Sequence, residues 1–242
     1  MKNTFHTTGR RIFLKMLCGE LAIIALCTVA STSATSQSVN RSLNSISGTV
    51  TVLDEDGRVI PDASNVVVFI DGISEQYQPE IGIDVPKISH RGRQFSPHVL
   101  PIVKGTTIDF LNDDSIYHNV FSLSEANTFD LGIYPEGTSK LVTFEQPGLV
   151  NVYCNIHPNM VSTILVLNNT MFVTTGADGA FEIRNIPDGQ FTLRVWYEFG
   201  EELSREVSLS GGNQLTEAFT LTAIRRIRTH DNKFGRPYRE KY

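Results

Sequence analysis

Short runs of Val, Ile, Thr and Phe recur along the chain from residue 46 onward, and Gly, Pro, Asn and Asp separate them. Residues 106–111 alternate between apolar and polar side chains, which is the period of a half-buried strand. No stretch after residue 34 has the pattern of a long helix. Many short strands divided by turn residues are typical of an all-β sandwich. The strands expected from the pattern are 46–52, 66–70, 94–103, 106–111, 118–121, 141–144, 149–154, 161–167, 172–174, 181–184 and 191–197, with further strands up to residue 221.

The first 34 residues have the organisation of an export signal. Arg10 and Arg11 are followed by Ile-Phe-Leu-Lys, then by an apolar run and a small-residue stretch that ends at Ala34. This order resembles a twin-arginine (Tat) signal, cleaved near Ala34, and it implies a bacterial periplasmic protein. An ordinary secretory signal or an uncleaved anchor are the alternatives. Gly19 and Glu20 interrupt the apolar run, so no stable membrane span is expected.

Charge is unevenly distributed along the chain. Residues 1–34 carry a net charge of +3, so the remaining residues carry −8 where the whole chain carries −5. A basic tail, residues 223–242, holds +5 of net charge on an otherwise acidic body. An acidic body argues against nucleic acid as a partner. We interpret the tail as a solvated extension, although it could steer an acidic protein or touch anionic lipid. Residues 35–45, rich in Ser and Asn, are expected to be a flexible leader.

Cys154 is the only cysteine that would remain after export, because Cys18 and Cys27 lie in the signal. A single thiol in an oxidising compartment has no partner for a disulfide within the chain. Metal ligation explains such a cysteine better than an inert buried thiol does.

Four side chains form a candidate metal site. Cys154, His157 and Met160 are spaced three residues apart, and His118 lies 36 residues before the cysteine. Two imidazoles, one thiolate and one weak thioether are the donors of a type 1 (blue) copper centre. Zinc would call for further sulfur or nitrogen ligands. We therefore expect one type 1 copper per chain.

Residues 87–167 resemble a cupredoxin. The resemblance is carried by Phe95-x-Pro97 and Val103-x-Gly105, by Asn112-Asp113 and His118-Asn119-Val120, by Pro147-Gly148, and by the Cys-x2-His-x2-Met loop, whose spacing is similar to that of amicyanin. It implies a Greek-key sandwich in which Asn119 braces the ligand loop. Tyr153, before the cysteine, is plastocyanin-like. The resemblance also implies that His157 lies nearest to solvent, on the path to a redox partner.

The flanking segments, 46–86 and 168–222, resemble two parts of one carboxypeptidase-regulatory-like (transthyretin-type) β-sandwich. We expect a discontinuous second domain with the cupredoxin inserted into it. This arrangement is similar to exported cupredoxins labelled methylamine-utilisation proteins. The alternative is three serial pieces packed as one irregular sandwich.

The function expected from these features is single-electron transport between redox proteins, such as a dehydrogenase and a c-type cytochrome. A copper oxidase is disfavoured, since no histidine flanks Cys154 and only five histidines follow His6. A copper-delivery protein, an envelope binding module and a catalytic red-copper site are the alternatives. His98 is interpreted as structural, and His90 and His230 as surface residues. Oligomeric state is left open.

Overall fold

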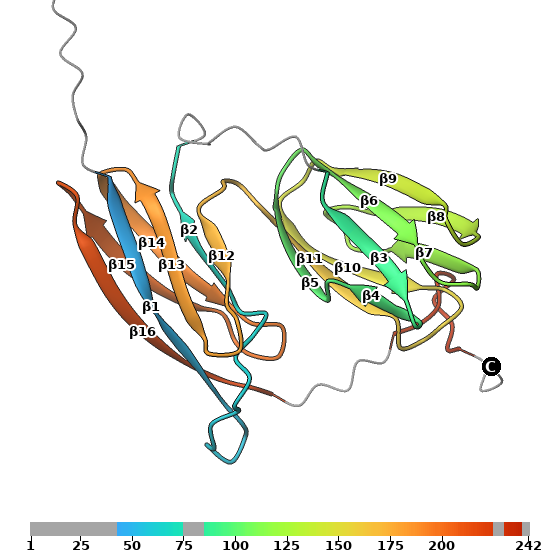
Figure 1. Cartoon of the computed structure of the whole chain (residues 1–242), viewed down its shortest axis with the longest axis horizontal. Helices are drawn as coiled ribbons and strands as arrows, with labels where there is room; N and C mark the ends of the chain where they lie inside the picture. Colours follow the sequence, from blue (N-terminus) through green and yellow to red (C-terminus); the bar gives the residue numbers. More distant parts are fainter. Residues whose placement is uncertain (1–42, 75–84, 225–229, 239–242) are drawn as a thin grey trace, which may run out of the picture. The chain divides into compact units, whose positions relative to one another are not determined.

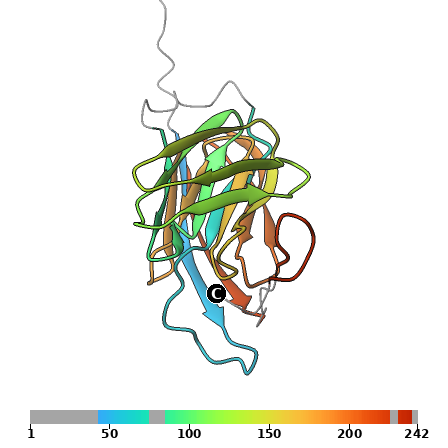
Figure 2. The same ribbon diagram turned by 90° about the vertical axis from the view of Figure 1, so that its right-hand side faces the viewer.

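The computed structural model describes residues 43–74, 85–224 and 230–238. Within these ranges the chain is all-β, with sixteen strands and no helix (Figure 1, Figure 2), which confirms the fold class expected from the pattern. No described segment is an apolar helix long enough to cross a membrane. The expected export signal, residues 1–34, lies outside the described ranges, as does most of the expected leader. Strand β1 begins at Asn44, one position before the expected end of the leader.

Two sheets pack into a first sandwich, which we call the flanking sandwich. Their strand orders are β13-β1-β16 and β12-β2-β14-β15. The strands come from two separate stretches of chain, one before and one after the second sandwich. They are β1 (Asn44–Leu53), β2 (Val67–Asp71), β12 (Phe172–Thr174), β13 (Ala180–Ile186), β14 (Gly189–Trp196), β15 (Leu203–Leu209) and β16 (Gln214–Thr222). Alternate apolar residues of β1, β13, β14 and β16 face one continuous core.

The intervening strands form a second sandwich, which we call the ligand sandwich. Its sheets have the orders β5-β11-β10-β7-β8 and β4-β3-β6-β9. Its strands are β3 (Lys87–Arg91), β4 (Gln94–Ser96), β5 (Val99–Val103), β6 (Thr106–Asn112), β7 (His118–Ser122), β8 (Phe129–Tyr134), β9 (Ser139–Phe144), β10 (Gly148–Cys154) and β11 (Val161–Leu167). Every second residue of β6 is buried, as its alternation predicts. Phe110, Tyr134 and Phe144 fill the core between the sheets.

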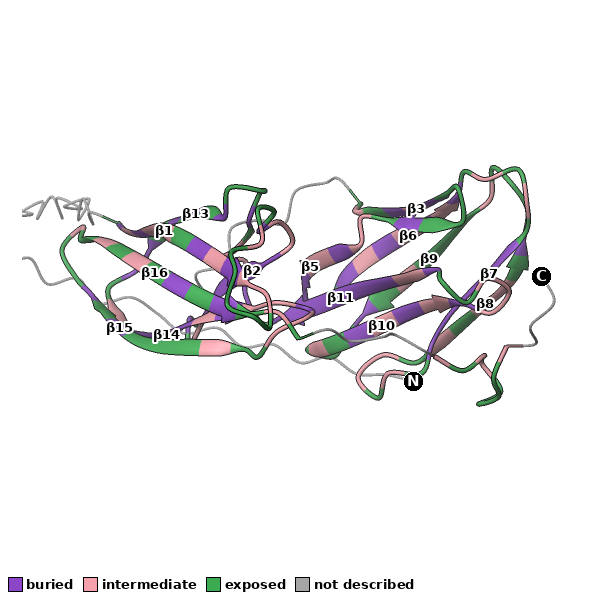
Figure 3. Ribbon diagram, turned by 90° about the horizontal axis from the view of Figure 1, so that it is seen from below, coloured by how far each residue is buried: buried purple, intermediate pink, exposed green. Residues whose placement is uncertain are grey.

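Strand β11 is buried on both of its faces (Figure 3). Ile164 and Val166 face the core of the ligand sandwich. Leu165 and Leu167 belong to a smaller apolar cluster that also contains residues of β2 and β5. A continuous apolar run is expected for a strand that is covered on both sides.

Two strands are missing from the sequence-based expectation. Residues 124–137 read as a loose stretch but contain β8, and β3 was not assigned. β8 lies at the edge of its sheet and buries only Tyr134 fully. A strand at the edge of a sheet can bury few side chains, and its alternation of apolar and polar residues is then weak.

Candidate metal centre

The pairing of two strands brings the candidate ligands together. His118 is the first residue of β7 and Cys154 is the last residue of β10. These strands are antiparallel neighbours, with Cys154 opposite Val120. The start of one strand therefore lies beside the end of the other. The last residue of β10 and the residues that follow it, 154–160, form what we call the ligand loop, which carries Cys154, His157 and Met160.

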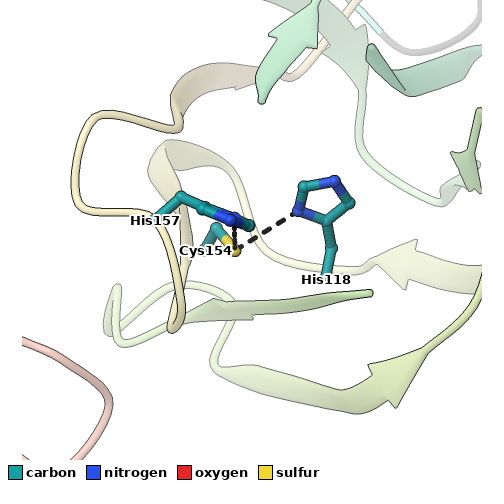
Figure 4. Close-up of side chains that lie close together, drawn as sticks. All are labelled: His118, Cys154 and His157. Atoms are coloured by element: carbon teal, nitrogen blue, oxygen red, sulfur yellow. Dashed lines mark hydrogen bonds between the residues drawn. The ribbon is translucent and has the colours of Figure 1, made fainter. Parts of the chain in front are cut away.

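The two imidazoles and the thiol converge on a common point (Figure 4). Cys154 Sγ lies 3.7 Å from Nδ1 of His118 and 3.6 Å from Nδ1 of His157. Bonds to a metal of about 2.3 Å from sulfur and 2.0–2.1 Å from nitrogen, at angles between tetrahedral and trigonal, require donors roughly 3.5–3.8 Å apart. The observed spacing of the sulfur from each nitrogen fits a single ion bound by all three residues.

Burial increases from the loop toward the core. His118, Cys154 and Met160 have no exposed surface, whereas His157 is half-buried. Cys154 and Met160 belong to the same core cluster. Burial lowers the pKa of both histidines, although Asp114 opposes this for His118. Both imidazoles are therefore held in the neutral form that binds metals.

Asp114 orients the buried histidine, and sequence reasoning did not identify it. Its carboxylate accepts a hydrogen bond from His118 Nε2 at 2.9 Å and from the backbone amides of Gly92 and Arg93. Burial acts to raise the pKa of Asp114, but these hydrogen bonds outweigh it and lower the pKa. With its Nε2 proton held by the carboxylate, His118 presents Nδ1 to Cys154. Such carboxylate–histidine pairs fix the tautomer and strengthen the imidazole as a ligand.

Asn119 supports the loop through its main chain. Its carbonyl oxygen accepts a hydrogen bond of 2.8 Å from the Asn155 amide. Its side-chain amide is directed to β8, where it donates to Asp130 Oδ1 and to the carbonyl oxygen of Gly132. Asn119 thus ties the ligand loop to the edge of the sheet.

His90 is not a surface residue, and the sequence-based interpretation was wrong. Its side chain is fully buried on β3, and its ring centroid lies 5.3 Å from that of His118. Burial, reinforced by His118, lowers the pKa of His90 to about 3. Its Nε2 lies 3.3 Å from the Tyr134 hydroxyl. The alternation of β3 turns Ile88 and His90 inward together.

His98 has the structural role expected of it. Its Nδ1 lies 3.2 Å from the carbonyl oxygen of Val161, and its Nε2 lies 2.5 Å from a carboxylate oxygen of the buried Glu198. It lies outside the group of three side chains that could hold a metal ion.

The described part of the basic tail is not a solvated extension. The ring of His230, interpreted as a surface residue, stacks on Tyr153 with centroids 4.1 Å apart. Tyr153 is half-buried and alternates along β10 with the buried Val152 and Cys154, and its ring centroid also lies 5.8 Å from that of Phe121.

Comparisons with known proteins give matches among solved structures alone. No family model and no curated protein matches the chain. A purple cupredoxin from Nitrosopumilus maritimus is 28% identical over 34% of this chain and 99% of its own, with a TM-score of 0.31. A copper-containing nitrite reductase from Thermus scotoductus is 26% identical over 37% of this chain, with a TM-score of 0.35, and the match spans 24% of that enzyme. A reduced amicyanin mutant is 16% identical over 41% of this chain and 98% of its own, with a TM-score of 0.33.

A depression of about 680 Å³ opens beside the exposed side of the centre. Its walls include Arg93, Tyr117, His157 and Pro158. Tyr117 is 60% exposed, which is unusual for a large aromatic side chain. His157 is therefore the candidate ligand that connects the buried donors to the solvent-facing surface.

Proposed function

We propose that the protein is an exported, periplasmic type 1 copper protein that carries single electrons between redox proteins. The partners would be of the dehydrogenase or c-type cytochrome class, and the chain itself would not be an enzyme. The observation that carries the proposal is the convergence of Cys154 Sγ on Nδ1 of His118 and His157 at 3.7 and 3.6 Å.

The donor set favours copper over zinc. Two imidazoles and one thiolate, with Met160 buried in the same core cluster, match the trigonal site with a weak axial thioether. Structural zinc sites use four strong donors. Among the described residues, the group of closely spaced His, Cys, Asp and Glu contains only these three ligands.

When bound, copper would supply a reversible one-electron couple at this site. The protein residues keep the donor positions constant. Cys154 and His118 are held at the ends of paired strands, and Asp114 fixes the orientation of His118. His157 borders the depression and offers an edge to a docked partner. A framework that does not rearrange between oxidation states favours rapid electron exchange.

Metal loading tests the proposal. Incubation with Cu(II) is expected to give one copper per chain and an intense visible absorption from thiolate-to-copper charge transfer. Cys154→Ser is expected to abolish that absorption, whereas Tyr117→Ala, close to the site but outside the donor set, should retain it. A colourless Cu(II) form of the protein, or a coloured Cys154→Ser variant, would refute the assignment.

Repeated voltammetric cycling separates an electron carrier from a copper-delivery protein. A carrier keeps its copper in both oxidation states, so the current is expected to remain constant in the presence of a Cu(I) chelator. Progressive loss of copper to the chelator would favour delivery.

A further inference from the structure

Residues 230–238, which we call the C-terminal segment, lie directly against the ligand loop. The Tyr238 hydroxyl donates a hydrogen bond of 2.6 Å to the carbonyl oxygen of Cys154. His230 Nε2 donates one of 2.7 Å to the carbonyl oxygen of Pro158, and the Lys233 amide donates one of 2.9 Å to Asn155 Oδ1. Three residues of the segment thus bind three positions of the loop.

These contacts complement the hydrogen bonds that the loop makes elsewhere. The amides of Cys154 and Met160 donate to carbonyl groups of the loop itself, and the Asn155 amide donates to Asn119. The C-terminal segment binds the acceptor side, at the carbonyl groups of Cys154 and Pro158. The segment thus supplies donors to two loop carbonyl groups, while partners within the ligand sandwich accept from the amides of Cys154, Asn155 and Met160.

The C-terminal segment is itself anchored to the ligand sandwich. Lys233 Nζ lies 2.7 Å from Asp130 Oδ2, and the other oxygen of Asp130 accepts a hydrogen bond from Asn119. The Asn119 carbonyl in turn binds the Asn155 amide. The segment, β8, β7 and the loop are thus connected in a closed ring of hydrogen bonds.

A turn gives the segment a defined shape of its own. The Asn232 amide donates to the carbonyl oxygen of Arg236, and Asn232 Oδ1 accepts from the Phe234 amide. This turn presents the Lys233 backbone and the Tyr238 ring to the loop at the same time.

We infer that the C-terminal segment is a positioning element of the metal centre. It holds the loop that carries Cys154, His157 and Met160 in its ligand-bearing shape before metal binds, and it slows metal release afterwards. Organising a site in advance lowers the conformational entropy lost on binding. The inference rests on the proposed function for the identity of the metal, whereas the three hydrogen bonds between the segment and the loop join protein groups alone.

Two variants test the inference. One is a chain that ends at residue 229, which removes the whole segment, and the other is Tyr238→Phe, which removes a single hydroxyl. Arg236→Ala is the matched control, because Arg236 is exposed and takes part in the turn through its backbone.

Hydrogen–deuterium exchange on the metal-free protein is the first measurement. The peptide spanning residues 153–161 is expected to exchange about fivefold faster in Tyr238→Phe, the size of change that one net hydrogen bond produces. Loss of the whole segment is expected to give an increase on the order of 100-fold, from three such bonds. Arg236→Ala should match the parent protein. Unchanged exchange in Tyr238→Phe would overturn the inference even if the truncated chain failed to fold.

Copper release to a chelator and the visible spectrum are the second measurement. Tyr238→Phe is expected to release copper faster than the parent protein, and the truncated chain faster still. Both should have a shifted charge-transfer band. Arg236→Ala should keep the parental release rate and spectrum. Parental release and spectra in both variants would contradict a positioning role. If the parent protein bound no copper with colour, the proposed function would fail, and the exchange experiment would still decide whether the segment holds the loop.

Discussion

Replacing Asp114 by Asn tests whether the carboxylate of Asp114 orients the imidazole of His118. The carboxylate accepts hydrogen bonds from His118 Nε2 and from the amides of Gly92 and Arg93. An Asn side chain keeps one acceptor oxygen and places an NH₂ group where the second oxygen was. At least one of these three N–H groups would then face the NH₂ group of Asn, and the negative charge beside the imidazole would be lost.

The expected fall in copper affinity follows from the loss of a charge-assisted hydrogen bond. Such a bond contributes about 1.5–3 kcal/mol, and the Asp114 side chain is only 15% exposed, so solvent screens it little. We expect copper affinity to fall by about 10- to 100-fold, as is typical when a residue that orients a metal ligand is changed. The carboxylate stabilises Cu(II) more than Cu(I), so the reduction potential should rise. Each tenfold difference between the affinity lost for Cu(II) and the affinity lost for Cu(I) shifts the reduction potential of a one-electron couple by about 59 mV.

The assay is chelator competition for each oxidation state together with voltammetry. Asp113→Asn is the matched control, since the neighbouring Asp113 pairs with Arg91 at the exposed surface. This control should keep the parental affinity and potential. An Asp114→Asn protein that is folded and retains both parental values would refute the claim that the carboxylate orients His118.

Three further outcomes are expected. Met160→Leu should keep the visible colour but raise the reduction potential, because a thioether donor stabilises Cu(II); an unchanged potential would remove Met160 from the ligand set. His90→Gln should reduce the acid sensitivity of the metal-free protein in urea titrations. Since burial holds the pKa of His90 at about 3 instead of 6.5, the unfolded chain alone binds this proton between those values. The contribution of neutral His90 to the free energy of unfolding is therefore fully present above pH 6.5, and it falls by up to about 1.4 kcal/mol per pH unit as the pH decreases below that value. An equally steep decline in His90→Gln would contradict the burial of His90. Phe144→Ala should lower the free energy of unfolding by about 3–5 kcal/mol, because Phe144 is fully buried in the ligand sandwich, and a loss under about 1 kcal/mol would contradict its place in the core.

The local sequence pattern was sufficient to predict features that depend on a single strand or a single loop. The alternation of residues 106–111 predicted β6, and its burial follows that alternation. Cys154 and His157 lie three residues apart on one loop, and the structure places Cys154 Sγ close to Nδ1 of both His157 and His118. The Greek-key expectation is consistent with the strand orders of the ligand sandwich.

Features that depend on distant pairing could not be found in this way. The burial of His90 follows from the parallel pairing of β3 with β6, in which His90 lies opposite Asn112. The contact between Tyr238 and Cys154 joins residues 84 positions apart, through a tail whose charge resembles that of a solvated extension. A signal for Asp114 did exist, because it lies four residues before His118 in a turn closed by Asn112. A carboxylate this close to a candidate ligand is a candidate for orienting it.

We propose that Cys154, His118 and His157 bind one copper that exchanges a single electron. An optical redox titration of the copper-loaded protein tests it most directly. We expect a visible band that disappears on reduction, returns fully on oxidation and follows a one-electron curve with one copper per chain. A Cu(II) protein without that band, or a band that does not return after reduction, would contradict the account.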